Sequence, residues 1–93
     1  MSQPKLAWNV HAERDHAYVI TGNVHMSIVN ATDGNGANEW RGYAFVGERG
    51  DTWNSVDLHE DSDCGTGDIV DAMARCEELT RAALVKLGGG LVK

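Results

Sequence analysis

The apolar residues of this 93-residue chain change their spacing once, at Asp68. Before residue 60, apolar and polar side chains mostly alternate, which is typical of strands that bury one face. From residue 68 to residue 87, apolar side chains recur with the 3.6-residue period of an amphipathic helix. A sheet followed by one helix predicts an α+β two-layer sandwich, with the helix packed on one face of the sheet.

The alternating part, residues 5–60, predicts a sheet of three or four antiparallel strands. The alternation is found in four segments, at residues 6–12, 16–29, 39–48 and 52–60. The segment 16–29 forms either one strand bent at Gly22 or a hairpin that turns at Gly22 and Asn23. We favour the bent strand, because a bulge at glycine commonly curves a sheet. The last two segments are joined by a short turn, which predicts a hairpin.

The C-terminal part predicts a helix over residues 68–87, in a single domain that comprises residues 1–93. Its apolar stripe consists of Ile69, Ala72, Met73, Cys76, Leu79, Ala83 and Leu87. Asp68 is expected to cap the first turn. Glu77 precedes Arg81 by four residues, the spacing of a surface ion pair. Gly88 is expected to end the helix, which leaves residues 88–93 as a flexible tail.

The formal net charge of −6 is concentrated in one segment. Residues 51–71 contain seven acidic residues and no Lys or Arg. This balance excludes direct nucleic-acid binding, which needs clustered cations to neutralise phosphates. An acidic segment instead attracts basic surfaces.

The acidic stretch 57–68 matches no metal-binding or catalytic motif. An EF-hand loop that began at Asp61 would lack its glycine at position 6 and its glutamate at position 12. His59 and Cys64 lack the partner spacing of a zinc motif, and no nucleophile or phosphate-binding motif is present. We therefore expect no metal, no cofactor and no catalytic residue. The four histidines, which lie on different segments, are interpreted as single surface side chains.

The aromatic residues predict an exposed apolar face. In segment 39–48, Trp40 shares one side with Ala44, whereas Tyr43 and Phe45 share the other side. One helix covers only one face of a sheet, so the uncovered face should expose aromatic area. Such a patch is typical of a protein contact or of self-association.

These features together predict a small acidic non-enzymatic domain that binds a basic protein surface or a nucleoprotein complex. Helix capping accounts for Asp68 and Asp71. It does not account for Asp57, Glu60 and Asp61, which are left without a structural role. The residues expected to bind the partner are Asp57, Glu60, Asp61 and Asp63, with Trp40 or Trp53 as an aromatic anchor. In size, charge and single-domain organisation the chain is similar in kind to phage-encoded inhibitors of bacterial defence, which block nucleic-acid sites. No motif carries this likeness.

Two alternative functions stay open. The first is a homodimer formed through the sheet face, which binds a metal ion or small ligand at the acidic loop 57–68. The second is an enzyme that uses His59 and neighbouring acids. The N-terminal residues MSQPKLAW lack the apolar stretch of a secretory signal, and no apolar run is long enough to cross a membrane. We therefore expect a cytoplasmic protein that contacts no membrane, in which Cys64 and Cys76 are free thiols.

Overall fold

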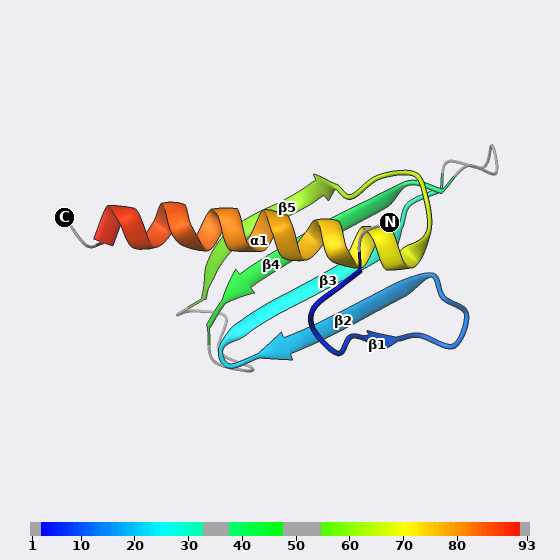
Figure 1. The fold of residues 1–93 in the computed structure, drawn as a ribbon, viewed down its shortest axis with the longest axis horizontal. Helices are drawn as coiled ribbons and strands as arrows, with labels where there is room; N and C mark the ends of the chain where they lie inside the picture. Colours follow the sequence, from blue (N-terminus) through cyan, green and yellow to red (C-terminus); the bar gives the residue numbers. More distant parts are fainter. Residues whose placement is uncertain (1–2, 33–37, 48–54, 92–93) are drawn as a thin grey trace.

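The fold is a five-stranded antiparallel sheet with one C-terminal helix on one face, as seen in a computed structural model that describes residues 3–32, 38–47 and 55–91 (Figure 1). The elements are β1 (Asn9–Val10), β2 (His16–Thr21), β3 (Val24–Asn30), β4 (Trp40–Val46), β5 (Val56–Asp63) and α1 (Ile69–Leu91). The strands follow one another in space in the order of the sequence. The predicted α+β two-layer class is confirmed, with five strands instead of three or four.

The additional strand arises at Gly22. The preference for one bent strand over residues 16–29 was wrong, because the chain turns there and β2 pairs with β3 from Thr21 opposite Val24. Gly22 has a φ of 60°, which suits the first central residue of a two-residue type II′ turn. Nothing lies within 4 Å of the position that a Cβ would occupy at Gly22. Glycine is therefore favoured there by backbone conformation and not by lack of space.

The boundaries of the sheet and of the helix also differ from the prediction. The sheet extends from Asn9 to Asp63, so the first half of the acidic stretch belongs to a strand and not to a loop. Asp68 does cap the helix, because its carboxylate accepts a hydrogen bond from the Ile69 amide at 2.7 Å. The predicted helix end at Gly88 was wrong, since α1 continues to Leu91. Glycine costs a helix only about 1 kcal/mol per residue, and each added residue of an established helix gains a backbone hydrogen bond.

The core lies between the sheet and the helix. Alternate residues of β2, β3 and β4 are buried on this side, and the predicted stripe of α1 packs against them through Ile69, Ala72, Met73 and Cys76. The helix contacts β3, β4 and β5 and crosses the sheet diagonally (Figure 1). Leu6 and Trp8, from the segment before β1, pack against the same core. The helix and this N-terminal segment together cover one face of the sheet.

Glu77 joins these two covering segments. Its carboxylate accepts hydrogen bonds from the Lys5 amide at 2.7 Å, the Leu6 amide at 3.0 Å and the Trp8 indole N–H at 2.8 Å. The residue is only 6% exposed. The expected surface pair with Arg81 is therefore replaced by a buried link to residues about 70 positions earlier. Hydrogen bonds to an ionised carboxylate are stronger than those between neutral groups.

The substitution Glu77→Ala should destabilise the fold by about 3 kcal/mol, because three donors lose their acceptor in a partly buried site. Urea unfolding monitored by tryptophan fluorescence measures this change. Glu78→Ala is the matched control. Glu78 is exposed and pairs with Arg75 at 3.2 Å, so its loss should cost less than about 1 kcal/mol. Equal effects of the two substitutions would contradict the proposed role of Glu77.

Candidate functional site

The face of the sheet that the helix leaves uncovered is apolar and aromatic. Tyr18 is 49% exposed, Ile20 is 45% exposed and Val29 is 37% exposed. Tyr43 and Phe45 are half-buried on the same side of β4. The prediction that the uncovered side exposes aromatic area is therefore confirmed. We call this surface the open face and define it by Tyr18, Ile20, Val29, Tyr43 and Phe45.

Strand register aligns these side chains in rows across the sheet. Tyr18 lies opposite Ser27, which in turn lies opposite Tyr43. In the next row, His25 separates Ile20 from Phe45. The rings of His25 and Phe45 stack with their centroids 4.4 Å apart and their planes 7° from parallel. Cross-strand contacts of this kind stabilise a sheet, and this one packs the Phe45 ring against His25.

The four predicted acids lie along β5, which is one edge of the sheet. All are exposed, and we call them the acidic edge: Asp57, Glu60, Asp61 and Asp63. Asp57 pairs with Phe45, and Asp63 pairs with Arg41. Residues paired across an antiparallel ladder project to the same side of the sheet. The acidic edge therefore borders the open face.

Irregular pairing of β5 with β4 produces this arrangement. The register shifts twice, between Gly42 and Ala44 and between Ala44 and Phe45. The first shift leaves Tyr43 opposite both Glu60 and Asp61, as in a β-bulge. Asp61 has a φ of 49°, a left-handed conformation that aspartate and asparagine adopt more readily than most residues. Its carboxylate lies 3.8 Å from the Arg41 Nε atom on the neighbouring strand.

Trp40 and Trp53 were the two tryptophans predicted as aromatic anchors, and the structure describes only Trp40. The prediction of Trp40 as a partner-binding anchor was wrong, because its side chain is only 2% exposed. Trp40 lies on the helix-facing side of β4, and its indole N–H donates a hydrogen bond to the Gly67 carbonyl at 2.9 Å. This contact fixes the segment that leads into the helix. Trp53 lies outside the described residues.

The same bulge directs His59 and Ser62 toward the helix. The His59 Nδ1 atom lies 2.9 Å from the Ser62 hydroxyl, and its Nε2 atom lies 2.9 Å from the Thr80 hydroxyl of α1. Thr80 donates its own proton to the Cys76 carbonyl at 2.8 Å, so it must accept one from His59 Nε2. The neutral imidazole then accepts the Ser62 proton at Nδ1. His59 was expected to be a single surface side chain, but it links β5 to the helix.

A serine in contact with a histidine is also the beginning of a nucleophile and base arrangement. In such sites a third group, often a carboxylate, orients the base. Here Thr80 occupies that position and its side chain is buried within the fold. The arrangement is therefore better suited to joining two elements than to stabilising an imidazolium.

Burial lowers the pKa of His59, and this effect outweighs a hydrogen bond to the Gly42 backbone that raises it. The lowered pKa agrees with the hydrogen-bond pattern, because that pattern requires a neutral imidazole. A positive charge on His59 would have to be accommodated among two hydroxyl groups and the core. His59 is therefore a candidate for acid-sensitive stability.

Cys76 of α1 and Cys64 of the segment before α1 lie together over Gly42 of β4. Both are free thiols, as predicted, and both are buried. A Cβ added at Gly42 would lie 2.5 Å from the Cys64 Sγ atom and 3.3 Å from the Cys76 Sγ atom, so glycine provides the space for both thiols. A hydrogen bond between the thiols lowers the pKa of Cys64 and raises that of Cys76. Their proximity was not expected from the sequence.

The acidic stretch does not gather metal ligands. Within the described part of the chain, one group of three potential ligand residues brings its ligand atoms together, and it consists of His11, Asp15 and His16. The alternative that placed a metal ion at residues 57–68 therefore has no matching ligand geometry in the described residues. The cluster lies instead at the turn between β1 and β2.

The comparisons with known proteins add no relative. No protein-family model, no curated protein and no solved structure matches the chain. Among the described residues, α1 is too polar to be a membrane-spanning helix.

The free energy of unfolding should depend on the protonation of His59. Because the pKa is lowered in the folded state, the unfolded chain binds more protons below about pH 6.5, the ordinary histidine value. The contribution of His59 to stability is thus fully present above this pH and is lost as the pH falls. His59→Gln, which cannot titrate there, should lose stability less steeply between pH 7 and pH 5. Urea unfolding at each pH provides the measurement.

Ser62→Ala serves as the control for this experiment, because it removes one partner of the ring but retains the imidazole. It should keep a pH dependence closer to that of the original protein. If His59→Gln and the original protein show the same slope, His59 does not control acid stability.

Proposed function

We propose that this protein is a small non-enzymatic binding domain that docks on a basic protein surface through its open face and acidic edge. The observation that carries the proposal is the register of β4 with β5, which pairs Phe45 with Asp57 and leaves Tyr43 opposite Glu60 and Asp61. Aromatic side chains and carboxylates thus border one another on a single surface.

This surface has the composition of a protein interface. The centre of an interface is typically depleted in charge and enriched in aromatic residues, and its rim is polar. Tyr18, Tyr43 and Phe45 take the anchoring role that the sequence assigned to tryptophan. Carboxylates at the rim steer a cationic partner during its approach and fix its orientation. The apolar centre would then supply most of the affinity.

The partner class follows from the charge of the acidic edge. A nucleic-acid-binding protein, or a nuclease complex with a cationic groove, presents the complementary surface. An acidic domain bound there would exclude nucleic acid, so we propose an inhibitor of the kind that phages use against bacterial defence. Its site of action would be the cytoplasm, where such complexes are found.

Neutralising three of the four residues of the acidic edge should weaken partner capture. We expect the variant Asp57→Asn, Glu60→Gln and Asp61→Asn to lose at least about tenfold of the binding seen with the original protein, because steering and rim contacts are lost together. Asparagine suits the left-handed backbone at position 61, so the fold should be retained. Immobilised protein is incubated with a host lysate at low salt and at high salt, and captured proteins are identified by mass spectrometry.

The matched control removes three acids elsewhere: Glu13→Gln, Asp71→Asn and Glu78→Gln. It has the same net charge as the test variant but keeps the acidic edge. The proposal is supported by basic proteins that are captured at low salt but not at high salt, and that the control variant captures but the test variant does not. If both variants retain the same proteins at both salt concentrations, the acidic edge does not mediate binding.

The second candidate is a homodimer formed through the open face. Such a dimer could also bind a small ligand. Tyr18, Ile20 and Val29 lie on β2 and β3, away from the acidic edge on β5. If the two sheets packed face to face about a two-fold axis parallel to β2 and β3, the two acidic edges would lie at opposite ends of the dimer, which reduces their repulsion. The two candidates therefore compete for one surface.

Light scattering distinguishes a homodimer from a monomer whose open face is free to bind a partner. A dimer has roughly twice the 10.1 kDa mass of the chain, and Ile20→Lys should return it to the monomer mass because a buried unpaired charge opposes association. Val85→Lys, on the helix, is the control and should leave the mass unchanged. A monomer mass for the original protein at high concentration would remove the dimer from consideration.

A further inference from the structure

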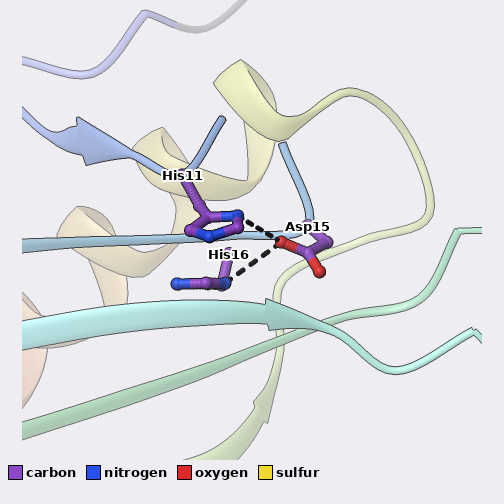
Figure 2. A group of neighbouring side chains, drawn as sticks. All are labelled: His11, Asp15 and His16. Carbon is purple, nitrogen blue, oxygen red and sulfur yellow. Dashed lines mark hydrogen bonds and ion pairs between the residues drawn. The ribbon is translucent and has the colours of Figure 1, made fainter. Parts of the chain in front are cut away.

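His11, Asp15 and His16 form a compact cluster at the turn that connects β1 with β2. Figure 2 shows both imidazole rings directed toward the same side chain, that of Asp15. The Asp15 Oδ1 atom lies 3.2 Å from the His11 Nδ1 atom and 3.1 Å from the His16 Nδ1 atom. The two rings stack on each other with their centroids 4.3 Å apart. Two nitrogen atoms and one oxygen atom are thereby brought together.

The backbone of the turn holds the three residues in place. The His11 amide donates to the His16 carbonyl at 3.0 Å, and the Arg14 amide donates to the His11 carbonyl at 2.8 Å. Arg14 has a φ of 57°, so the chain turns sharply just before Asp15. The Asp15 carbonyl in turn accepts a hydrogen bond from the Asn30 amide of β3 at 2.8 Å. The cluster therefore belongs to the sheet and not to an unattached loop.

We propose that His11, Asp15 and His16 bind one divalent transition-metal ion. Ligand atoms about 2.0–2.1 Å from a tetrahedral zinc ion are about 3.3 Å from one another. The two nitrogen-to-oxygen separations in the cluster are close to this value. The three ligand atoms all lie within 4.8 Å of one another.

The ligand types select the class of ion. Imidazole nitrogen suits zinc, nickel and copper, whereas calcium and magnesium prefer oxygen ligands. Two neutral imidazoles and one carboxylate leave a net charge of +1 on the loaded cluster, which exposed surroundings tolerate. Three protein ligands do not complete a tetrahedron, so the ion keeps a position open for water or another donor.

Binding requires a rearrangement that the exposed side chains permit. The planes of the stacked rings are 25° from parallel, so their Nδ1 lone pairs do not yet converge on one point. Rotation of the rings would replace the stack by two metal bonds and would displace the Glu13 amide, which lies 3.3 Å from the His11 Nδ1 atom. Both histidine side chains are 45% exposed, and no core residue has to move with them.

The cluster lies beside the proposed binding surface, although the metal-site proposal does not depend on the proposed function. His16 pairs with Val29, and Val29 pairs with Arg41, so His16 lies in a row of the open face. The cluster occupies the corner of this face that is farthest from β5. An ion held there would present its open position beside the apolar surface.

Isothermal titration of the chelator-treated protein with Zn²⁺, and separately with Ni²⁺ and Ca²⁺, tests the site. We expect one saturable Zn²⁺ or Ni²⁺ ion per chain and no heat from Ca²⁺. The variants His11→Ala, Asp15→Asn and His16→Gln should each weaken binding by at least about tenfold, since each removes one of three ligands. In the NMR spectrum, the ring signals of His11 and His16 should shift on loading.

Two controls distinguish this cluster from other donors in the chain. His25→Ala removes a histidine that stacks on Phe45 outside the cluster, and Cys64→Ser removes a thiol that could bind zinc. Both should bind Zn²⁺ as the original protein does. The proposal is overturned if the three cluster variants retain the original affinity, if either control variant loses it, or if no saturable binding is seen up to millimolar Zn²⁺.

Discussion

One constraint organises the described part of the chain: a five-stranded sheet has two faces, and one helix lies against one of them. The helix contacts β3, β4 and β5, and the N-terminal segment extends this cover through the three hydrogen bonds that Glu77 accepts. Among the described residues, both of these segments lie on the same side of the sheet. The other side keeps Tyr18, Ile20 and Val29 in contact with solvent. Exposed apolar area of this kind is the usual mark of a binding surface.

The second organising feature is the irregular pairing of β5. The extra residues of this strand let His59 and Ser62 face the helix while Asp57 remains beside Phe45. One strand thus serves both purposes, since its inner side joins the helix through Thr80 and its outer side carries the acidic edge. As an edge strand with exposed carboxylates, β5 is also protected against pairing with the edges of other sheets.

Periodicity predicted the layers, the apolar stripe of the helix and the exposed aromatic face, because these depend on which residues alternate. It did not predict contacts between distant residues. Glu77 has the sequence pattern of a surface acid, and only the fold brings Trp8 to it. Trp40 was misassigned because both sides of β4 are apolar and parity alone does not say which side meets the helix. The cluster at His11 and His16 had a local signal, namely two histidines that flank a short turn and therefore meet across a hairpin.

Hydroxyl-radical footprinting of the protein, free and in complex with a captured partner, tests whether the open face is the binding surface. The method reports the solvent exposure of individual side chains, and the open face contains reactive aromatic rings. We expect Tyr18, Tyr43 and Phe45 to become protected in the complex, while Val85, which is 70% exposed on the helix, stays reactive. Protection of Val85 with unchanged reactivity of the three rings would contradict this expectation, because the partner would then be bound to the helix and not to the open face.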